Sequence, residues 1–181
     1  MIKKLLLGLL ALILLLAAAV GINTVRKGSH QLQVAPLAPV AVDEKAVAER
    51  LAEAVRLKTV SSRDDAALNA DQFKALHSLI QTKFPKTHAA LKREVVNDLS
   101  LLYTWEGADP KAKPIMLMAH QDVVPIAAGT EGDWQVAPFA GEVKDGFVWG
   151  RGSWDDKGNL MSQLEAVEML VASGYKPPRT I

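Results

Sequence analysis

The sequence contains no cysteine in its 181 residues. This absence excludes disulfide bonds, thiolate zinc sites and cysteine nucleophiles. An excess of one charge is also lacking, because 21 Lys and Arg against 20 Asp and Glu give a formal net charge of +1. No basic block occurs beyond the flanks of the N-terminal segment, so we expect no nucleic-acid partner. Past that segment there is neither an internal repeat nor a low-complexity region.

One long hydrophobic run is present near the N-terminus. Leu5–Ile22 carries no charged residue and is flanked by Lys3-Lys4 and Arg26-Lys27. As a helix it would be about 27 Å long, close to the roughly 30 Å hydrocarbon core of a bilayer. We expect residues 1–27 to be an uncleaved signal anchor, a single transmembrane helix, in preference to a cleaved signal peptide. Either form would place the remainder outside the cytoplasm, anchored to the membrane or, after cleavage, secreted.

The rest of the chain divides into a linker and one domain. Residues 28–42 contain Pro36 and Pro39 and no hydrophobic periodicity, which indicates an extended linker. From residue 43, periodicity predicts an alternation of helices and strands. The helices are expected at 43–58, within 64–84 and at 159–173, and the strands at 92–96, 99–105, 115–119, 141–144 and 147–149. This pattern predicts an α/β fold with a mostly parallel central sheet flanked by helices.

A predicted buried strand leads directly to a histidine and an aspartate. Ile115–Ala119 is a bounded apolar run, and Pro125 cannot continue a sheet, so the strand should end near His120. His120 and Asp122 are two positions apart, which puts both side chains on one side of an extended backbone. Ligands of α/β sheets gather at such carboxyl ends of strands.

A second motif, Gly150–Gly158, precedes the last predicted helix and carries Asp155 and Asp156. Neutral imidazole and carboxylate are good zinc ligands, and a carboxylate can bridge two metal ions. We therefore predict His120 as a metal ligand and Asp155 as a bridging ligand. Asp122 is expected to support catalysis by fixing the tautomer of the imidazole. Asp156 is expected to be a helix cap or a supporting group.

Both motifs resemble those of a zinc metallopeptidase family that includes carboxypeptidase S, aminoacylase, glutamate carboxypeptidase and succinyl-diaminopimelate desuccinylase. His120–Pro125 matches His-x-Asp-Val-Val-Pro, and Gly150–Gly158 matches Gly-Arg-Gly-x-x-Asp-x-Lys-Gly. Trp134–Phe139 resembles the family's Trp-x-x-x-Pro-Phe segment. The resemblance runs from about Asp43 to Ile181 and is closest to the carboxypeptidase S branch. It implies a zinc-exopeptidase-like fold.

The resemblance also implies an activity. Two zinc ions would activate a bridging water for cleavage of an amide bond beside a free carboxylate, in a small peptide or an N-acyl amino acid. The family's general base belongs to a Glu-Glu pair that these residues lack, as they lack a further acidic ligand and a late histidine. We expect residues 43–181 to be the N-terminal part of a catalytic domain that is inactive alone. A lid or dimerisation domain outside them would form a homodimer.

Two alternatives stay open: a deacylase or desuccinylase of the same family, and a non-catalytic membrane-anchored domain that binds a metal or a partner. The other notable side chains are expected to have structural roles. Arg151 is expected to brace its loop through carbonyls or carboxylates, and Lys157 to form a cap or an ion pair. Trp134, Phe139 and Trp149 are expected to pack within loops. His30, His77 and His88 are expected to be structural or solvent-exposed.

Overall fold

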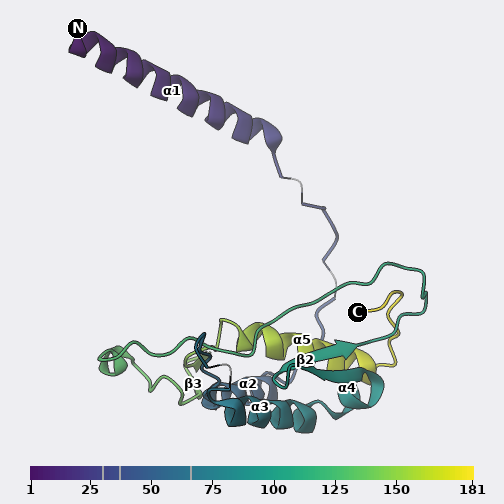
Figure 1. Ribbon diagram of the computed structural model, residues 1–181. Helices are drawn as coiled ribbons and strands as arrows, with labels where there is room; N and C mark the ends of the chain where they lie inside the picture. The colour runs from purple at the N-terminus through teal and green to yellow at the C-terminus, as the bar shows by residue number, and fades with distance from the viewer. Residues whose placement is uncertain (30, 37, 66) are drawn as a thin grey trace. The chain divides into compact units, whose positions relative to one another are not determined.

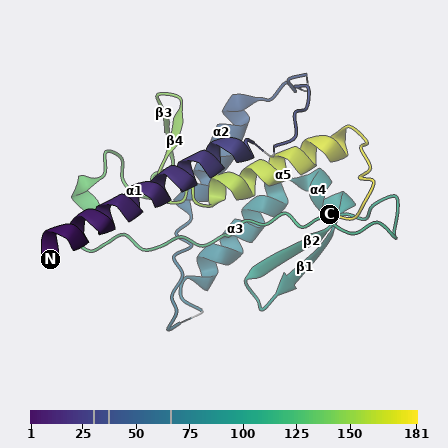
Figure 2. The ribbon, with the colours of Figure 1, turned by 90° about the horizontal axis from the view of Figure 1, so that it is seen from above.

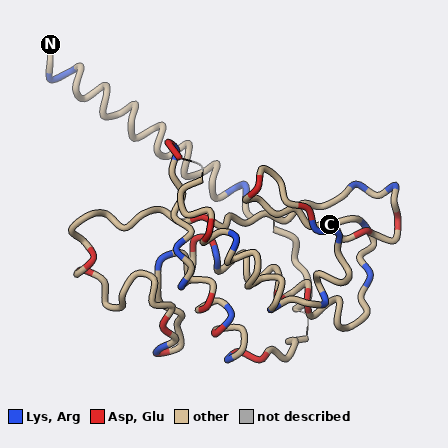
Figure 3. The backbone as a smooth tube through the Cα atoms, turned by 60° about the horizontal axis from the view of Figure 1, so that its bottom comes forward, with Lys and Arg blue, Asp and Glu red and all other residues tan. Residues whose placement is uncertain are grey.

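The computed structural model describes residues 1–29, 31–36, 38–65 and 67–181, which divide into two units, 1–41 and 42–181. His30 lies outside the described residues. The first unit contains α1 (Ile2–Lys27), whose most apolar window has a mean hydropathy of 3.0. Lys and Arg lie at both ends of this helix (Figure 3). By length and composition α1 could cross a membrane, a property that an N-terminal signal sequence shares. The described residues between Lys27 and Glu44 contain no helix or strand.

Three helices build the core of the second unit (Figure 1). They are α2 (Glu44–Arg56), α3 (Ala70–Lys83) and α5 (Lys157–Ala172), and they confirm the three predicted helices. The carboxylate of Asp43 caps α2 by accepting a hydrogen bond from the Ala46 amide at 3.0 Å. Pro85 ends α3 but also begins a short helix that was not predicted, α4 (Pro85–Ala90), because proline suits a first helical turn. The buried apolar cluster comprises Ala54, Leu76, Ile80, Phe84, Met161 and Leu164.

Two hairpins confirm the predicted short strands at 92–105 and 141–149, and Figure 2 shows them as separate ribbons. β1 (Lys92–Val96) pairs antiparallel with β2 (Ser100–Thr104), and β3 (Glu142–Lys144) pairs antiparallel with β4 (Phe147–Trp149). The second hairpin turns at Asp145-Gly146, where both residues have the positive φ that such a tight turn requires.

The predicted mostly parallel central sheet is not found among the described residues. Their strands form two two-stranded antiparallel sheets, and the parallel pairing there is an isolated bridge between Val60 and Val123. The predicted strand 115–119 is irregular, and the side chains of Met116 and Met118 are 75% and 73% exposed. An apolar run becomes a strand only when neighbouring strands pair with its backbone. The described residues place no strand beside this segment, so this prediction was wrong for the structure.

Two polar contacts join α2 to α5 and thereby fix the start of α5, where the second motif ends. Arg50 and Glu165 form a two-pronged ion pair, with 2.8 Å between Nη2 and Oε2. Lys157 is fully buried, and its Nζ donates to the carbonyls of Ala54 at 2.9 Å and Leu57 at 2.6 Å. Lys157 is thus a cap, one of its two predicted roles. Burial lowers the pKa of its ammonium to about 8.

Candidate functional site

His120 lies between two carboxylates. Its Nε2 is 2.9 Å from Oδ1 of Asp155, and its Nδ1 is 3.2 Å from Oδ1 of Asp122 and 2.9 Å from the Asp122 backbone carbonyl. The structure therefore brings together the three residues that the two motifs single out, although 35 positions separate His120 from Asp155. The His120 side chain is 50% exposed, so the group is open to solvent.

Asp156 holds the backbone of the histidine. Its Oδ2 accepts a hydrogen bond from the His120 amide at 3.0 Å and another from Asn159 Nδ2 at 3.4 Å. Asp156 occupies the N-cap position of α5, as predicted, but its side chain makes no capping hydrogen bond there and instead supports the backbone of His120, the second of its predicted roles. The peptide bond between Asp155 and Asp156 is cis.

The segment Thr59–Ser61 runs beside the histidine motif. The Val123 amide donates to the Thr59 carbonyl at 2.9 Å, and the Ser61 amide donates to the Val123 carbonyl at 3.3 Å. The Ser61 hydroxyl donates to Oδ2 of Asp122 at 2.5 Å. These contacts leave the other oxygen of Asp122 directed at His120. The sequence alone gave this segment no role, because nothing in its composition indicates that Ser61 has a partner 61 positions away.

A partly buried chain of hydrogen bonds supports the residue between His120 and Asp122. His77 Nε2 lies 2.8 Å from Oε1 of Gln121, whose Nε2 donates to the Leu99 carbonyl at 3.1 Å. This second bond orients the amide, so the histidine is the donor to Oε1. Burial lowers the pKa of His77, which favours the neutral ring. His77 is 6% exposed and structural, as predicted.

The electrostatics of His120 favour a cation between its ring and Asp155. Partial desolvation opposes protonation, but hydrogen bonds to the Asp122 carbonyl and the Asp155 carboxylate, with the charges of Asp122 and Asp156, outweigh it and raise the pKa of His120. When the ring is neutral with its proton on Nδ1, Nε2 directs a lone pair at Asp155. Two lone pairs 2.9 Å apart require a proton or a metal ion between them.

Zinc accepts this donor pair, because imidazole nitrogen and carboxylate oxygen are both among its usual ligands. The chemistry of His120 and Asp155 therefore fits one part of a zinc site. Within the ranges that the structure describes, no group of three or more His, Cys, Asp or Glu side chains is arranged to hold a metal ion. The pair is thus an incomplete ligand set, and the bridging role of Asp155 stays a prediction.

The glycine-rich loop needs its glycine at position 152. Gly152 has φ of +84°, and a Cβ there would lie 2.6 Å from Cγ1 of Val123. The loop is held by backbone hydrogen bonds from the Arg151 amide to the Pro138 carbonyl at 2.6 Å and from the Lys157 amide to the Gly152 carbonyl at 3.1 Å. This close packing sets the loop against the residue that follows Asp122.

Arg151 lines the same hollow as His120, Asp122 and Asp155, which encloses about 230 Å³. Its guanidinium lies over the ring of Trp134, 5.1 Å from the centroid. In the described part of the chain it forms no ion pair, and its buried Nε has no hydrogen-bond partner. The predicted brace through its side chain is therefore not observed there. A cation with unused donors suits a carboxylate ligand.

Comparison with known proteins places these motifs in a family. Residues 116–181 match peptidase family M20/M25/M40. The chain is 47% identical to carboxypeptidase S of Saccharomyces cerevisiae over 140 residues. This alignment covers 74% of this chain and 24% of that protein. It is 36% identical to human N-fatty-acyl-amino acid synthase/hydrolase PM20D1 over 159 residues. This second alignment covers 86% of this chain and 31% of that protein.

The fold has relatives among solved structures. Human carnosine dipeptidase 1 superposes with a TM-score of 0.54 at 21% identity, covering 76% of this chain and 31% of that structure. The chain thus spans about a quarter to a third of the relatives that it matches. The resemblance predicted from the two motifs is confirmed, and the chain is related to the M20 metallopeptidases, a family of hydrolases that includes carboxypeptidase S.

Proposed function

We propose that this chain is part of a zinc-dependent hydrolase that cleaves an amide bond beside a free carboxylate. The observation that carries the proposal is the position of His120 between Asp122 and Asp155, inside the segment that matches the M20 family. The names of its relatives suggest two substrate classes, peptides for carboxypeptidase S and N-acyl amino acids for the fatty-acyl-amino acid hydrolase.

His120 Nε2 and Asp155 Oδ1 would hold the metal. Zinc, when bound, supplies a water of lowered pKa and polarises the carbonyl that is attacked. Asp122 keeps a proton on Nδ1 of His120 through its carbonyl and carboxylate, so that the lone pair of Nε2 is free for ligation. A glutamate outside these residues would take the proton of the water and return it to the leaving amine.

Arg151 would bind the free carboxylate of the substrate. The support is its place in the hollow with His120 and its unused donors in the described structure. A guanidinium stacked on an aromatic ring is held in one plane, which favours a two-pronged contact with a carboxylate. This contact would favour substrates with a free carboxylate over the same substrates with a neutral amide in its place.

A longer protein would supply the parts that these residues lack. The support is the exposed apolar segment at 115–118 and the greater length of the relatives. In that protein we expect this segment to become a strand of a mostly parallel central sheet. Further metal ligands, the general base and a dimerisation domain would also lie there, and α1 would anchor the catalytic part outside the cytoplasm.

The test measures zinc and turnover together in the protein at its full native length. We expect metal analysis to find zinc, and we expect a chelator to abolish hydrolysis of a peptide or an N-acyl amino acid until zinc is added back. Replacing the free carboxylate by an amide should slow cleavage. Hydrolysis that survives complete zinc removal, or no hydrolysis of either class by the zinc-loaded protein, would contradict the proposal.

A further inference from the structure

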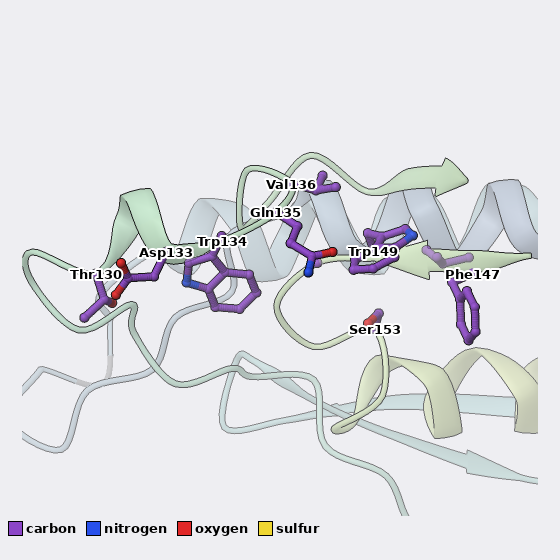
Figure 4. A pocket seen from close by; sticks show the side chains of 10 residues that line it. Thr130, Asp133, Trp134, Gln135, Val136, Phe147, Trp149 and Ser153 are labelled. Atoms are coloured by element: carbon purple, nitrogen blue, oxygen red, sulfur yellow. The ribbon is translucent and has the colours of Figure 1, made fainter. Parts of the chain in front are cut away.

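A second cavity lies beside the hollow that contains His120. It encloses about 490 Å³ between the loop that includes the short 3-10 helix η1 (Glu131–Asp133) and the hairpin β3–β4 (Figure 4). Three aromatic side chains line it, those of Trp134, Phe147 and Trp149. This volume lies within the range of small-molecule sites, roughly 300–1,000 Å³, which are mostly apolar with a few polar groups.

The aromatic side chains of this cavity keep apolar surface available. Phe147 is 66% exposed although it stands in a strand, and its ring meets Trp149 edge to face with 6.1 Å between the centroids. The indole N–H of Trp149 already donates to the Lys144 carbonyl at 3.0 Å. The ring of Trp149 therefore offers a ligand apolar surface and no unsatisfied donor. An exposed group of this kind indicates a binding surface.

The cavity adjoins the candidate site. Trp134, Gly150 and Ser153 line both the cavity and the hollow that holds His120 and Asp155. One ligand could thus reach from the zinc ligands into the aromatic cavity. The carboxylate of Asp133 lies on the cavity wall, and it would repel a carboxylate there. The anionic end of a substrate is therefore better placed at Arg151, which lines the hollow of His120 and not this cavity.

We propose that the aromatic cavity binds an apolar group attached to the scissile amide, an aromatic or aliphatic side chain or acyl group. This inference rests on the proposed function and specifies its substrate class. It also gives Trp134 and Trp149 a role in substrate binding, where the sequence predicted loop packing for them.

The test compares two ligands that differ only in their apolar group, N-acetylglycine and N-(phenylacetyl)glycine. Their Kd values are measured by calorimetry on the zinc-depleted protein of full native length, so that no turnover occurs. Phe147→Ser removes one wall, and because this side chain is mostly exposed the hairpin should persist. The matched control is Val143→Ser, which changes a 48% exposed residue of β3 outside the cavity wall.

We expect Phe147→Ser to raise the Kd of N-(phenylacetyl)glycine about tenfold and to leave that of N-acetylglycine unchanged. Val143→Ser should change neither. Equal effects of Phe147→Ser on both ligands would overturn the inference. No effect on either ligand would also overturn it and would mean that another part of the protein fills the cavity. If the zinc-loaded wild type still hydrolyses both ligands, only this inference fails. If it hydrolyses neither, the proposed function fails.

Discussion

The ammonium group of Lys157 donates a hydrogen bond to the carbonyl of Leu57 at 2.6 Å, across 100 positions of sequence. It also donates to the Ala54 carbonyl, so it is a second donor to two carbonyls at the C-terminal end of α2, which also accept from the backbone amides of Leu57 and Thr59. The lysine of the second motif therefore stabilises the fold that carries the site. It joins the loop of Asp155 to a helix far away in the sequence.

Replacing this lysine should destabilise the protein. Lys157→Met keeps a similar length but removes one of the two donors to each of these carbonyls, and we expect the free energy of unfolding to fall by about 2 kcal/mol. Urea unfolding followed by circular dichroism measures the change. Lys176→Met, at an exposed position, is the control and should have little effect. An unchanged or increased stability of Lys157→Met would show that desolvation of the ammonium costs more than its hydrogen bonds contribute.

His120→Ala should remove bound zinc from the protein at its full native length. The variant loses the Nε2 donor that faces Asp155, so the zinc content should fall and hydrolysis should cease. Metal analysis of purified protein measures the content. His88→Ala is a suitable control, because His88 bonds the Phe84 carbonyl and Tyr103 instead of a site residue. Wild-type zinc content and turnover in His120→Ala would refute the assignment.

Asp122→Asn tests the orientation of the imidazole. The substitution keeps the shape but weakens the acceptor that faces Nδ1 of His120, and we expect zinc affinity to fall about 10–100-fold. Competition with a chromogenic chelator gives the affinity. A structural effect alone would lower stability and leave the affinity of the folded fraction unchanged, which is the result that would contradict this role.

Arg151→Gln should raise KM for a substrate with a free carboxylate by about tenfold or more, because a charge-assisted pair is lost. The matching amide substrate should keep its KM. Arg179→Gln is the control, since this exposed arginine approaches the Lys113 carbonyl and lines neither cavity. Equal losses on both substrates would indicate that Arg151 supports the loop and not the carboxylate.

His77 should make stability depend on pH. Burial lowers its pKa in the folded protein, and Arg93 adds to this effect, whereas the unfolded chain has a pKa near the ordinary value of about 6.5. As pH falls below about 6.5 the unfolded state binds a proton that the folded state excludes, so the free energy of unfolding falls. Above that pH the effect vanishes. His77→Gln keeps a donor to Gln121 and should lose this part of the dependence in urea unfolding at several pH values.

Local patterns predicted most elements, because their causes lie within a few residues. Asp43 caps the helix that follows it, and Asp145-Gly146 closes a tight turn. The segment 115–119 failed for the opposite reason, since a strand depends on partners that its own sequence does not contain. The motifs pointed to His120 and Asp155, and the structure places them side by side.

Other parts of the site depend on tertiary contacts that carry no local signal. Ser61 bonds Asp122, and His77 bonds Gln121, yet nothing in their sequence spacing distinguishes these residues from ordinary polar residues on a protein surface. Arg151 was expected to brace its loop, a role that its backbone amide fulfils through Pro138. Whether an arginine side chain keeps free donors can be judged only once its neighbours are placed.

The exposed segment at 115–118 has a practical consequence for handling the molecule. It combines exposed apolar side chains with a backbone that no strand of the described residues pairs with, although the Ile115 amide and the Met118 carbonyl have other hydrogen-bond partners. This combination promotes edge-to-edge aggregation. Deleting α1 would therefore not be enough to keep residues 42–181 from self-associating in solution. Their usable concentration would be limited by self-association through this segment, and detergent or a covering partner would be needed even without the N-terminal helix.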